Sequence, residues 1–107
     1  MSKGTIVLVP FPFTDLSGHK VRPCLVLHEQ KNGEDCLVAC ISSTTPVSSV
    51  YDLRVKPSPI NGLKQESVIR CNKLATLQKK IFLGELGKLE TSSLKAVDAR
   101  LMKMLDL

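Results

Sequence analysis

The amino-terminal part of the chain carries three short apolar runs that are rich in β-branched and aliphatic side chains. They cover residues 4–9, 21–27 and 35–41, and residues that favour turns separate them. Each run is too short for a helix of ordinary length, whereas a buried strand needs only about four to eight such residues. The sequence therefore predicts a sheet that begins as a meander of neighbouring strands.

Shorter strand candidates follow, at spacings that suit a small barrel or a tightly curved sheet. They lie at residues 51–55, at 67–70 and around 73–77. Loops are predicted where glycine, proline and hydroxyl residues gather, at residues 13–20, 43–49 and 56–63. Because loops carry the mobile and exposed groups of a protein, functional side chains are expected on them.

Helical periodicity is confined to the last segment, where Thr91 or Ser92 is the expected N-cap. Charged residues occupy one face of this segment and apolar residues the other. The apolar residues are Leu94, Val97, Leu101 and Met104 or Leu105. We therefore predict a mainly β fold with a C-terminal helix, in one domain over residues 1–107, since a chain of 107 residues suits a single hydrophobic core.

The charge and the apolar pattern limit the partners and the compartment. A net charge of +5 favours an anionic partner, and residues 67–84 carry basic side chains without any acidic one. That stretch fits phosphate neutralisation and a solvated basic face equally well. No window approaches the roughly 20 apolar residues that span a bilayer, and no signal peptide begins the chain. We expect a cytoplasmic protein without a membrane partner.

The cysteines give little support to a metal site. Cys36 and Cys40 would share one face of a strand, but zinc ribbons use closer spacings and a second pair. Cys24 and His28 would also share a face, where plain packing is the more common role. Four cysteines in apolar segments do not resemble a disulfide framework either. We expect reduced, mostly buried thiols and no metal or other cofactor.

A cation at the start of one strand and hydroxyls at the end of the next form a more productive combination. Arg22 opens the second predicted strand, and Ser42 closes the third. A hairpin brings the start of one strand beside the end of the next, so these side chains are expected close together. A guanidinium and a hydroxyl can hold a phosphate between them. A surface ion pair for Arg22 and a turn for Ser42 remain the plainer interpretations.

Several motifs in a fixed order resemble the PemK/MazF family of toxins. Residues 4–18 and the following Lys20-Val21-Arg22-Pro23 are similar to its amino-terminal signature. Ala39-Cys40-Ile41-Ser42-Ser43 resembles its strand that ends in a hydroxyl residue. Residues 67–77, residues 84–89 and the last helix resemble its later blocks. The resemblance covers nearly the whole chain, and the ordered set is far more specific than Arg22-Pro23 alone.

This resemblance implies an SH3-like small β-barrel of the PemK/MazF/CcdB type, a homodimer and the toxin component of a type II toxin–antitoxin system. The implied activity is metal-independent, sequence-selective cleavage of single-stranded RNA to a 2′,3′-cyclic phosphate and a 5′-hydroxyl. Arg22 falls at the family's catalytic arginine. Ser42 falls where many members carry a catalytic threonine, and so departs from the pattern. Serine keeps the hydroxyl but loses the methyl group that restricts the rotamer.

Further site residues are expected around this pair. His19 is a candidate for proton transfer because histidine titrates near neutral pH, although a solvated loop histidine is the more common state. The residues expected to bind RNA are Thr14, Lys20, Ser43, Thr44, Arg70 and Lys73.

Two other functions and one partner complete the expectations. A CcdB-like toxin that poisons DNA gyrase through its C-terminal helix would share the architecture, and an inactive RNA-binding barrel would share the surface. The expected partner is a cognate antitoxin with an acidic, partly disordered segment that covers the basic groove and whose complex with the toxin binds DNA.

Overall fold

The computed structural model describes residues 1–11, 20–43 and 46–107. Its six strands form one sheet with the order β4-β5-β3-β2-β1-β6, in which every neighbouring pair is antiparallel. The strands are β1 (Thr5–Phe11), β2 (Lys20–Glu29), β3 (Asp35–Ser42), β4 (Asp52–Val55), β5 (Ser67–Gln78) and β6 (Gly84–Lys88). A short 3₁₀ helix, η1 (Lys79–Ile81), follows β5, and the helix α1 (Thr91–Met104) follows β6. The predicted mainly β fold with a C-terminal helix is confirmed.

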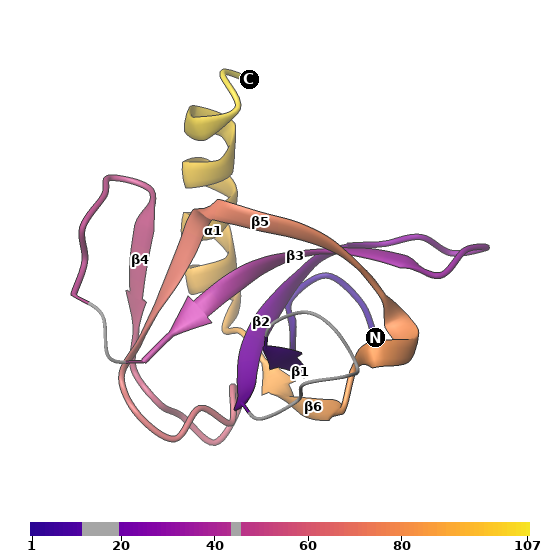
Figure 1. The fold of residues 1–107 in the computed structure, drawn as a ribbon. Coiled ribbons are helices and arrows are strands. Elements are labelled where there is room, and N and C mark those ends of the chain that lie inside the picture. The colour runs from indigo at the N-terminus through magenta and orange to yellow at the C-terminus, as the bar shows by residue number, and fades with distance from the viewer. Residues whose placement is uncertain (12–19, 44–45) are drawn as a thin grey trace.

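The sheet curls into a half-barrel, and the irregular strand β5 takes part in the bend (Figure 1). On β3, Ala39 pairs with Leu74 whereas the next residue, Cys40, pairs with Arg70. The residues between these two partners on β5 therefore form a bulge, which bends the strand and increases its twist. The sequence predicted two separate strands at 67–70 and 73–77, and the structure joins them into one bent strand.

Successive side chains point to opposite faces of the sheet, and each face has its own apolar cluster. One cluster includes Ile6, Leu25 and Ile69, and the fully buried Val97 of α1 joins it. The other includes Val7, Cys24 and Val38 and receives residues that follow β5. The central strands are therefore apolar on both faces, which explains why they read as continuous apolar runs.

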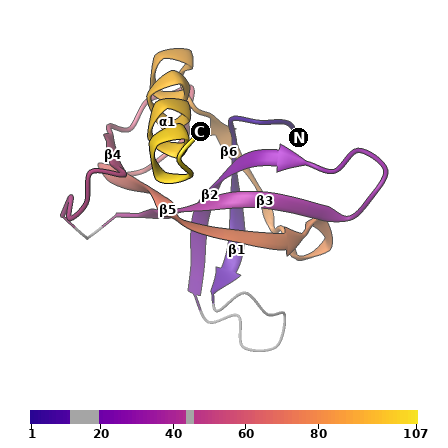
Figure 2. The ribbon, with the colours of Figure 1, turned by 90° about the horizontal axis from the view of Figure 1, so that it is seen from above.

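Helix α1 packs against β4 and β5 on one side of the sheet (Figure 2). Its start differs from the prediction, because Glu90 is the N-cap and Thr91 is already helical. The Glu90 carboxylate accepts a hydrogen bond from the Ser58 hydroxyl, which lowers the pKa of Glu90, and another from Asn61 Nδ2 at 3.2 Å. A tertiary contact to the 56–63 loop thus fixes the helix start where a local side-chain cap was expected. No helix in the described residues is long and apolar enough to cross a membrane.

Strand β6 was not predicted because its sequence, Gly-Glu-Leu-Gly-Lys, has little of the β-branched character of a strand. It lies at the edge of the sheet beside β1, where the pairing register shifts between Ile6 and Val7. A Cβ atom on Gly87 would lie only 2.3 Å from the carbonyl oxygen of Ile60. Glycine at this position therefore allows a close approach between β6 and the 56–63 loop.

Replacing Leu25 by alanine should lower the free energy of unfolding by about 2–5 kcal/mol, because the fully buried side chain would leave a cavity. The matched change Leu83→Ala should alter it by at most about 0.5 kcal/mol, since Leu83 is 59% exposed. Urea denaturation of both variants measures the difference. Equal losses would show that the central sheet is not the core.

Candidate functional site

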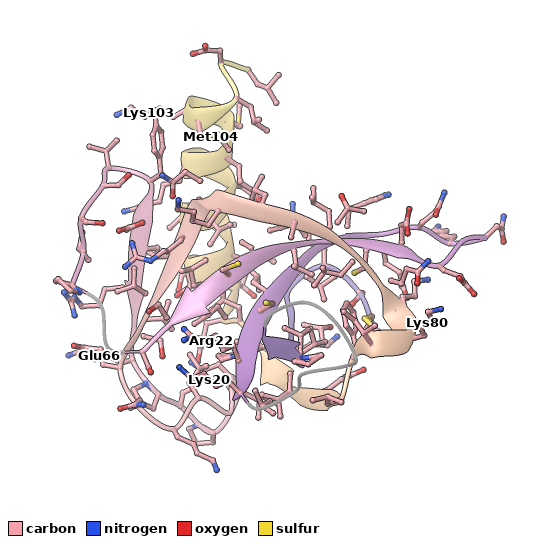
Figure 3. The ribbon with its side chains drawn as sticks, viewed as in Figure 1. Lys20, Arg22, Glu66, Lys80, Lys103 and Met104 are labelled. Atoms are coloured by element: carbon pink, nitrogen blue, oxygen red, sulfur yellow. The ribbon has the colours of Figure 1, made fainter. Side chains whose placement is uncertain are left out.

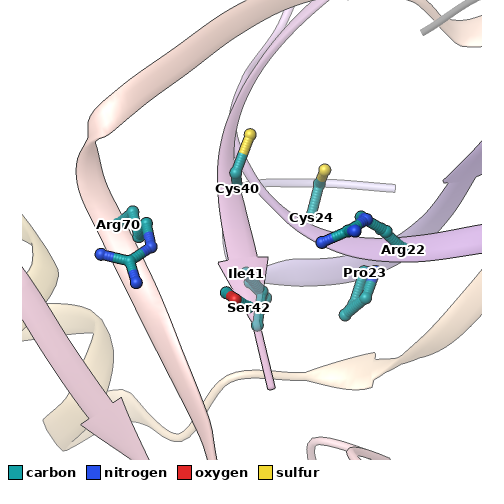
Figure 4. Close-up of a pocket in the computed structure, with 7 residues that line it drawn as sticks. All are labelled: Arg22, Pro23, Cys24, Cys40, Ile41, Ser42 and Arg70. Atoms are coloured by element: carbon teal, nitrogen blue, oxygen red, sulfur yellow. The ribbon is translucent and has the colours of Figure 1, made fainter. Parts of the chain in front are cut away.

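The pairing of β2 with β3 sets the geometry of the site. Cys24 on β2 lies directly opposite Cys40 on β3 in an antiparallel register. Arg22 lies two residues before Cys24, and Ser42 lies two residues after Cys40. In an antiparallel pairing both residues are therefore at the same end of the two strands. Because residues two apart on a strand share a face, all four side chains lie on one face of the sheet. They line a pocket of about 160 Å³ together with Pro23, Ile41 and Arg70, which are drawn in Figure 4.

Arg22 therefore enters the pocket from one strand and Ser42 from the next, as the hairpin argument predicted. Arg22 is half-buried. On the other side of β2, it is paired with Val9 of the neighbouring strand β1. Figure 4 shows Arg22 extending from β2 towards β3, with Ser42 and Arg70 across the pocket from it.

Arg70 forms the far wall of the pocket and is anchored by a buried carboxylate. It lies opposite Cys40 in the β3–β5 pairing, and its Nη1 donates a hydrogen bond to Asp52 Oδ2 at 2.9 Å. The Asp52 side chain is fully buried and also accepts hydrogen bonds from the backbone NH and hydroxyl of Ser48. Asp52 thus fixes Arg70 in place and compensates much of its charge. This role of Asp52 was not predicted from the sequence, because only the pairing of β4 with β5 brings the two residues together.

The other predicted site residues are distributed around this pocket. Lys20 and Ser43 line a neighbouring hollow of about 350 Å³ that shares Arg22, Pro23 and Ile41 with the first one. Figure 3 places Lys20 and Arg22 at the same end of β2. Lys73 is exposed on β5. The residues that lie outside the described part of the chain are Thr14, His19 and Thr44.

The basic stretch 67–84 does not act as one surface. Lys79 lies at the opposite end of the β2–β3 hairpin, where its Nζ donates to the Gln30 carbonyl at 2.8 Å and lies 3.2 Å from Glu29 Oε2. Lys80 is likewise far from Arg22 (Figure 3). Arg70 and Lys73 are the cations of this stretch that lie towards the pocket. Charge counted along the sequence overstated the size of the basic patch.

The opposed cysteines are a feature of the pocket that the sequence analysis missed. The Cys24 thiol donates a hydrogen bond to Cys40, which lowers the pKa of Cys40; burial opposes this effect, while the positive charges of Arg22 and Lys73 add to it. The result is a Cys40 pKa of about 7. The same hydrogen bond, with burial, raises the pKa of Cys24 far above its ordinary value. Cys40 is half-buried, whereas Cys24, Cys36 and Cys71 are buried, as expected for most thiols here.

The pocket offers the chemistry of a phosphate site. A guanidinium and a hydroxyl on adjacent strands supply hydrogen-bond donors to anionic oxygens, and Lys20 adds a positive charge at the open side. Within the ranges described, no group of three or more His, Cys, Asp or Glu side chains is placed to hold a metal ion. Cys24 and His28 are also separated, because the register shift between Val26 and His28 leaves Cys24 buried and His28 exposed.

Solved structures share this curled sheet with its C-terminal helix. An endoribonuclease in complex with its cognate antitoxin, from a mycobacterial species, has a TM-score of 0.81 at 15% identity and covers 100% of this chain and 96% of its own. The Mycobacterium tuberculosis toxin MazF-mt6 has a TM-score of 0.76 at 24% identity, with 96% and 97% covered. A MazE-MazF structure from Deinococcus radiodurans has a TM-score of 0.76 at 18% identity, with 100% and 96% covered. The fold is that of the MazF toxins.

The family model of the PemK-like, MazF-like toxins of type II toxin–antitoxin systems matches residues 2–105. The chain belongs to this family, as its ordered motifs predicted. A comparison with curated proteins gave no match.

Iodoacetamide should alkylate Cys40 at a rate that is half-maximal near pH 7, because the thiolate is the nucleophile. Cys71 is the internal control, since burial raises its pKa to about 11. Peptide mass spectrometry across a pH series measures both rates in one sample. A Cys40 rate that rises only above pH 8.5 would contradict the described hydrogen bond and charges.

Proposed function

We propose that this protein is a metal-independent endoribonuclease that cleaves single-stranded RNA at the pocket between β2 and β3. The observation that carries the proposal is the convergence of Arg22 and Ser42, from adjacent strands, on one small pocket. Membership of the PemK-like, MazF-like toxin family supports it. RNA suits such a site because it brings its own nucleophile, the 2′-hydroxyl, so that a phosphate clamp and proton transfer are sufficient.

The proposed reaction is an internal displacement at phosphorus. The 2′-oxygen of the RNA forms a bond to phosphorus, the bond from phosphorus to the 5′-oxygen breaks, and the departing oxygen gains a proton. Arg22 binds the nonbridging oxygens, where negative charge develops, and assists protonation of the leaving oxygen. Ser42 donates a hydrogen bond to a nonbridging oxygen. The products are a 2′,3′-cyclic phosphate and a 5′-hydroxyl.

Residues around the pocket are proposed to hold the RNA on either side of the cut. Lys20 and Ser43 extend the site along the neighbouring hollow, and Lys73 adds a charge on the β5 side. Arg70 contributes mainly as a fixed wall, since its charge is compensated by Asp52. His19 stays a candidate for proton transfer, and the remaining candidates for RNA contact are Thr14 and Thr44.

We further propose a homodimer in the cytoplasm that is inhibited by a cognate antitoxin. The net charge of +5 and the basic rim of the pocket favour an acidic segment that covers the same surface as RNA. Two of the similar structures are described as complexes with an antitoxin or with MazE. Inhibition would then follow from competition for one surface.

The ribonuclease proposal is tested by incubating the purified protein with a long single-stranded RNA in EDTA and mapping the cuts by primer extension. Discrete cuts are expected, and Arg22→Ala should slow them by at least about 100-fold because a main stabiliser of the developing charge is lost. Arg54→Ala is the matched control, since Arg54 is an exposed arginine of strand β4 that forms an ion pair with Glu66. Unchanged cutting by Arg22→Ala would refute the mechanism.

Two variants at position 42 examine the hydroxyl in the same assay. Ser42→Ala should cut more slowly than the wild type, whereas Ser42→Thr should cut at least as fast because its methyl group restricts the rotamer. Intact RNA with every variant would favour the gyrase-poison or inactive-barrel alternatives. A gyrase poison should instead lose toxicity when the exposed Met102 and Leu105 at the end of α1 are replaced.

Antitoxin binding is measured by calorimetry with the product of the adjacent reading frame. Tight binding is expected, and Lys20→Ala should weaken it because a charge at the rim of the pocket is removed. Lys103→Ala is the matched control, since Lys103 lies near the end of α1, away from the pocket (Figure 3). Absence of any heat of binding would count against the proposed partner.

A further inference from the structure

The two cysteines in the pocket are placed for a covalent link. Cys24 and Cys40 are direct partners in the antiparallel β2–β3 pairing, and both side chains line the same pocket. Directly opposed residues in such a pairing have Cα atoms about 4.5–5.5 Å apart. Disulfides bridge Cα separations of roughly 4.4–6.8 Å, so the separation expected for this pairing lies within the range that a disulfide spans.

The two thiols also differ in the way that a reactive pair requires. Cys40 is half-buried, lines the pocket and lies close enough to Arg22 and Lys73 for their charges to stabilise its thiolate. Cys24 is buried beside it and donates the hydrogen bond. Cys36 and Cys71 are buried elsewhere in the apolar clusters. Cys40 is therefore the thiol that meets an oxidant first, and Cys24 is the one positioned to react next.

We propose that Cys40 is a peroxide-sensitive thiol and that its oxidation links it to Cys24 by a reversible disulfide across the pocket. The Cys40 thiolate attacks one oxygen of hydrogen peroxide, the O–O bond breaks, and the hydroxide that leaves takes up a proton to become water. Cys40 then carries a sulfenic acid. The Cys24 sulfur attacks the Cys40 sulfur and gives up its thiol proton; the S–S bond forms, the S–O bond breaks, and the departing hydroxyl takes up that proton and leaves as a second water. Peroxide is reduced and the two thiols are oxidised.

One consequence rests on the proposed RNA site. The Cys40 thiolate is a negative charge close to Arg22, so it opposes the attraction of Arg22 for phosphate. The disulfide removes this charge. We therefore expect the oxidised pocket to bind a phosphate backbone more tightly than the reduced one at a pH where Cys40 is ionised.

The covalent step is tested by treating the wild-type protein with hydrogen peroxide and mapping its peptides by mass spectrometry without reduction. The expected product is a Cys24–Cys40 cross-link that disappears with dithiothreitol, while Cys36 and Cys71 stay reduced. Cys24→Ser keeps a hydrogen-bond donor and should stop at a Cys40 sulfenic acid, which dimedone traps. Equal oxidation of Cys36 or Cys71, or a Cys24 that oxidises as fast in Cys40→Ser as in the wild type, would overturn the proposal.

The consequence is tested by fluorescence anisotropy at pH 8 with a labelled RNA oligonucleotide that carries 2′-deoxy sugars and is not cleaved. The oxidised wild type should bind it several-fold more tightly than the reduced protein, and Cys40→Ser should show no change with peroxide. Equal or weaker binding after oxidation would overturn the coupling to Arg22. If neither form binds the oligonucleotide, the RNA site fails while the mass-spectrometric result still decides the disulfide chemistry.

Discussion

The antiparallel register between β2 and β3 is the constraint on which the rest of the site depends. Because Cys24 lies opposite Cys40, Arg22 and Ser42 lie at the same end of the two strands and on the same face of the sheet. A slip of one residue would send one of the two strands' side chains to the other face and separate the pair. The buried side chains on both faces of the central strands are closely packed, so such a slip would disrupt the packing of both clusters.

Two neighbouring groups, Asp52 and Cys40, influence the charge of the pocket around Arg22 and Ser42. Asp52, which is fully buried, compensates Arg70 at the far wall and keeps its guanidinium fixed. Burying this carboxylate is tolerable because Arg70 and Ser48 donate hydrogen bonds to it. On the other side, the lowered pKa of Cys40 places a partly ionised thiol near Arg22. The pocket is therefore a set of neighbouring charges whose balance depends on the state of one cysteine.

Much of the fold was predictable from local sequence, and much of the site was not. Short apolar runs predicted the central strands, and helical spacing predicted α1. Strand β6 and the start of α1 at Thr91 escaped prediction because contacts with the 56–63 loop decide both. Hairpin reasoning and family resemblance placed Arg22 beside Ser42. The Cys24–Cys40 pair depends on the register shift between Val26 and His28, and the Asp52–Arg70 pair depends on the pairing register of β4 with β5; no local pattern reveals either register.

The most direct measurement of the central claim is a crystal structure of the protein with an RNA oligonucleotide that carries a 2′-deoxy sugar at the mapped cleavage position. Without the attacking hydroxyl the strand stays intact, so the phosphate that would be cut is seen in place. The account predicts its nonbridging oxygens within hydrogen-bonding distance of the Arg22 guanidinium and the Ser42 hydroxyl. A phosphate seated elsewhere, with the pocket between β2 and β3 empty, would contradict it.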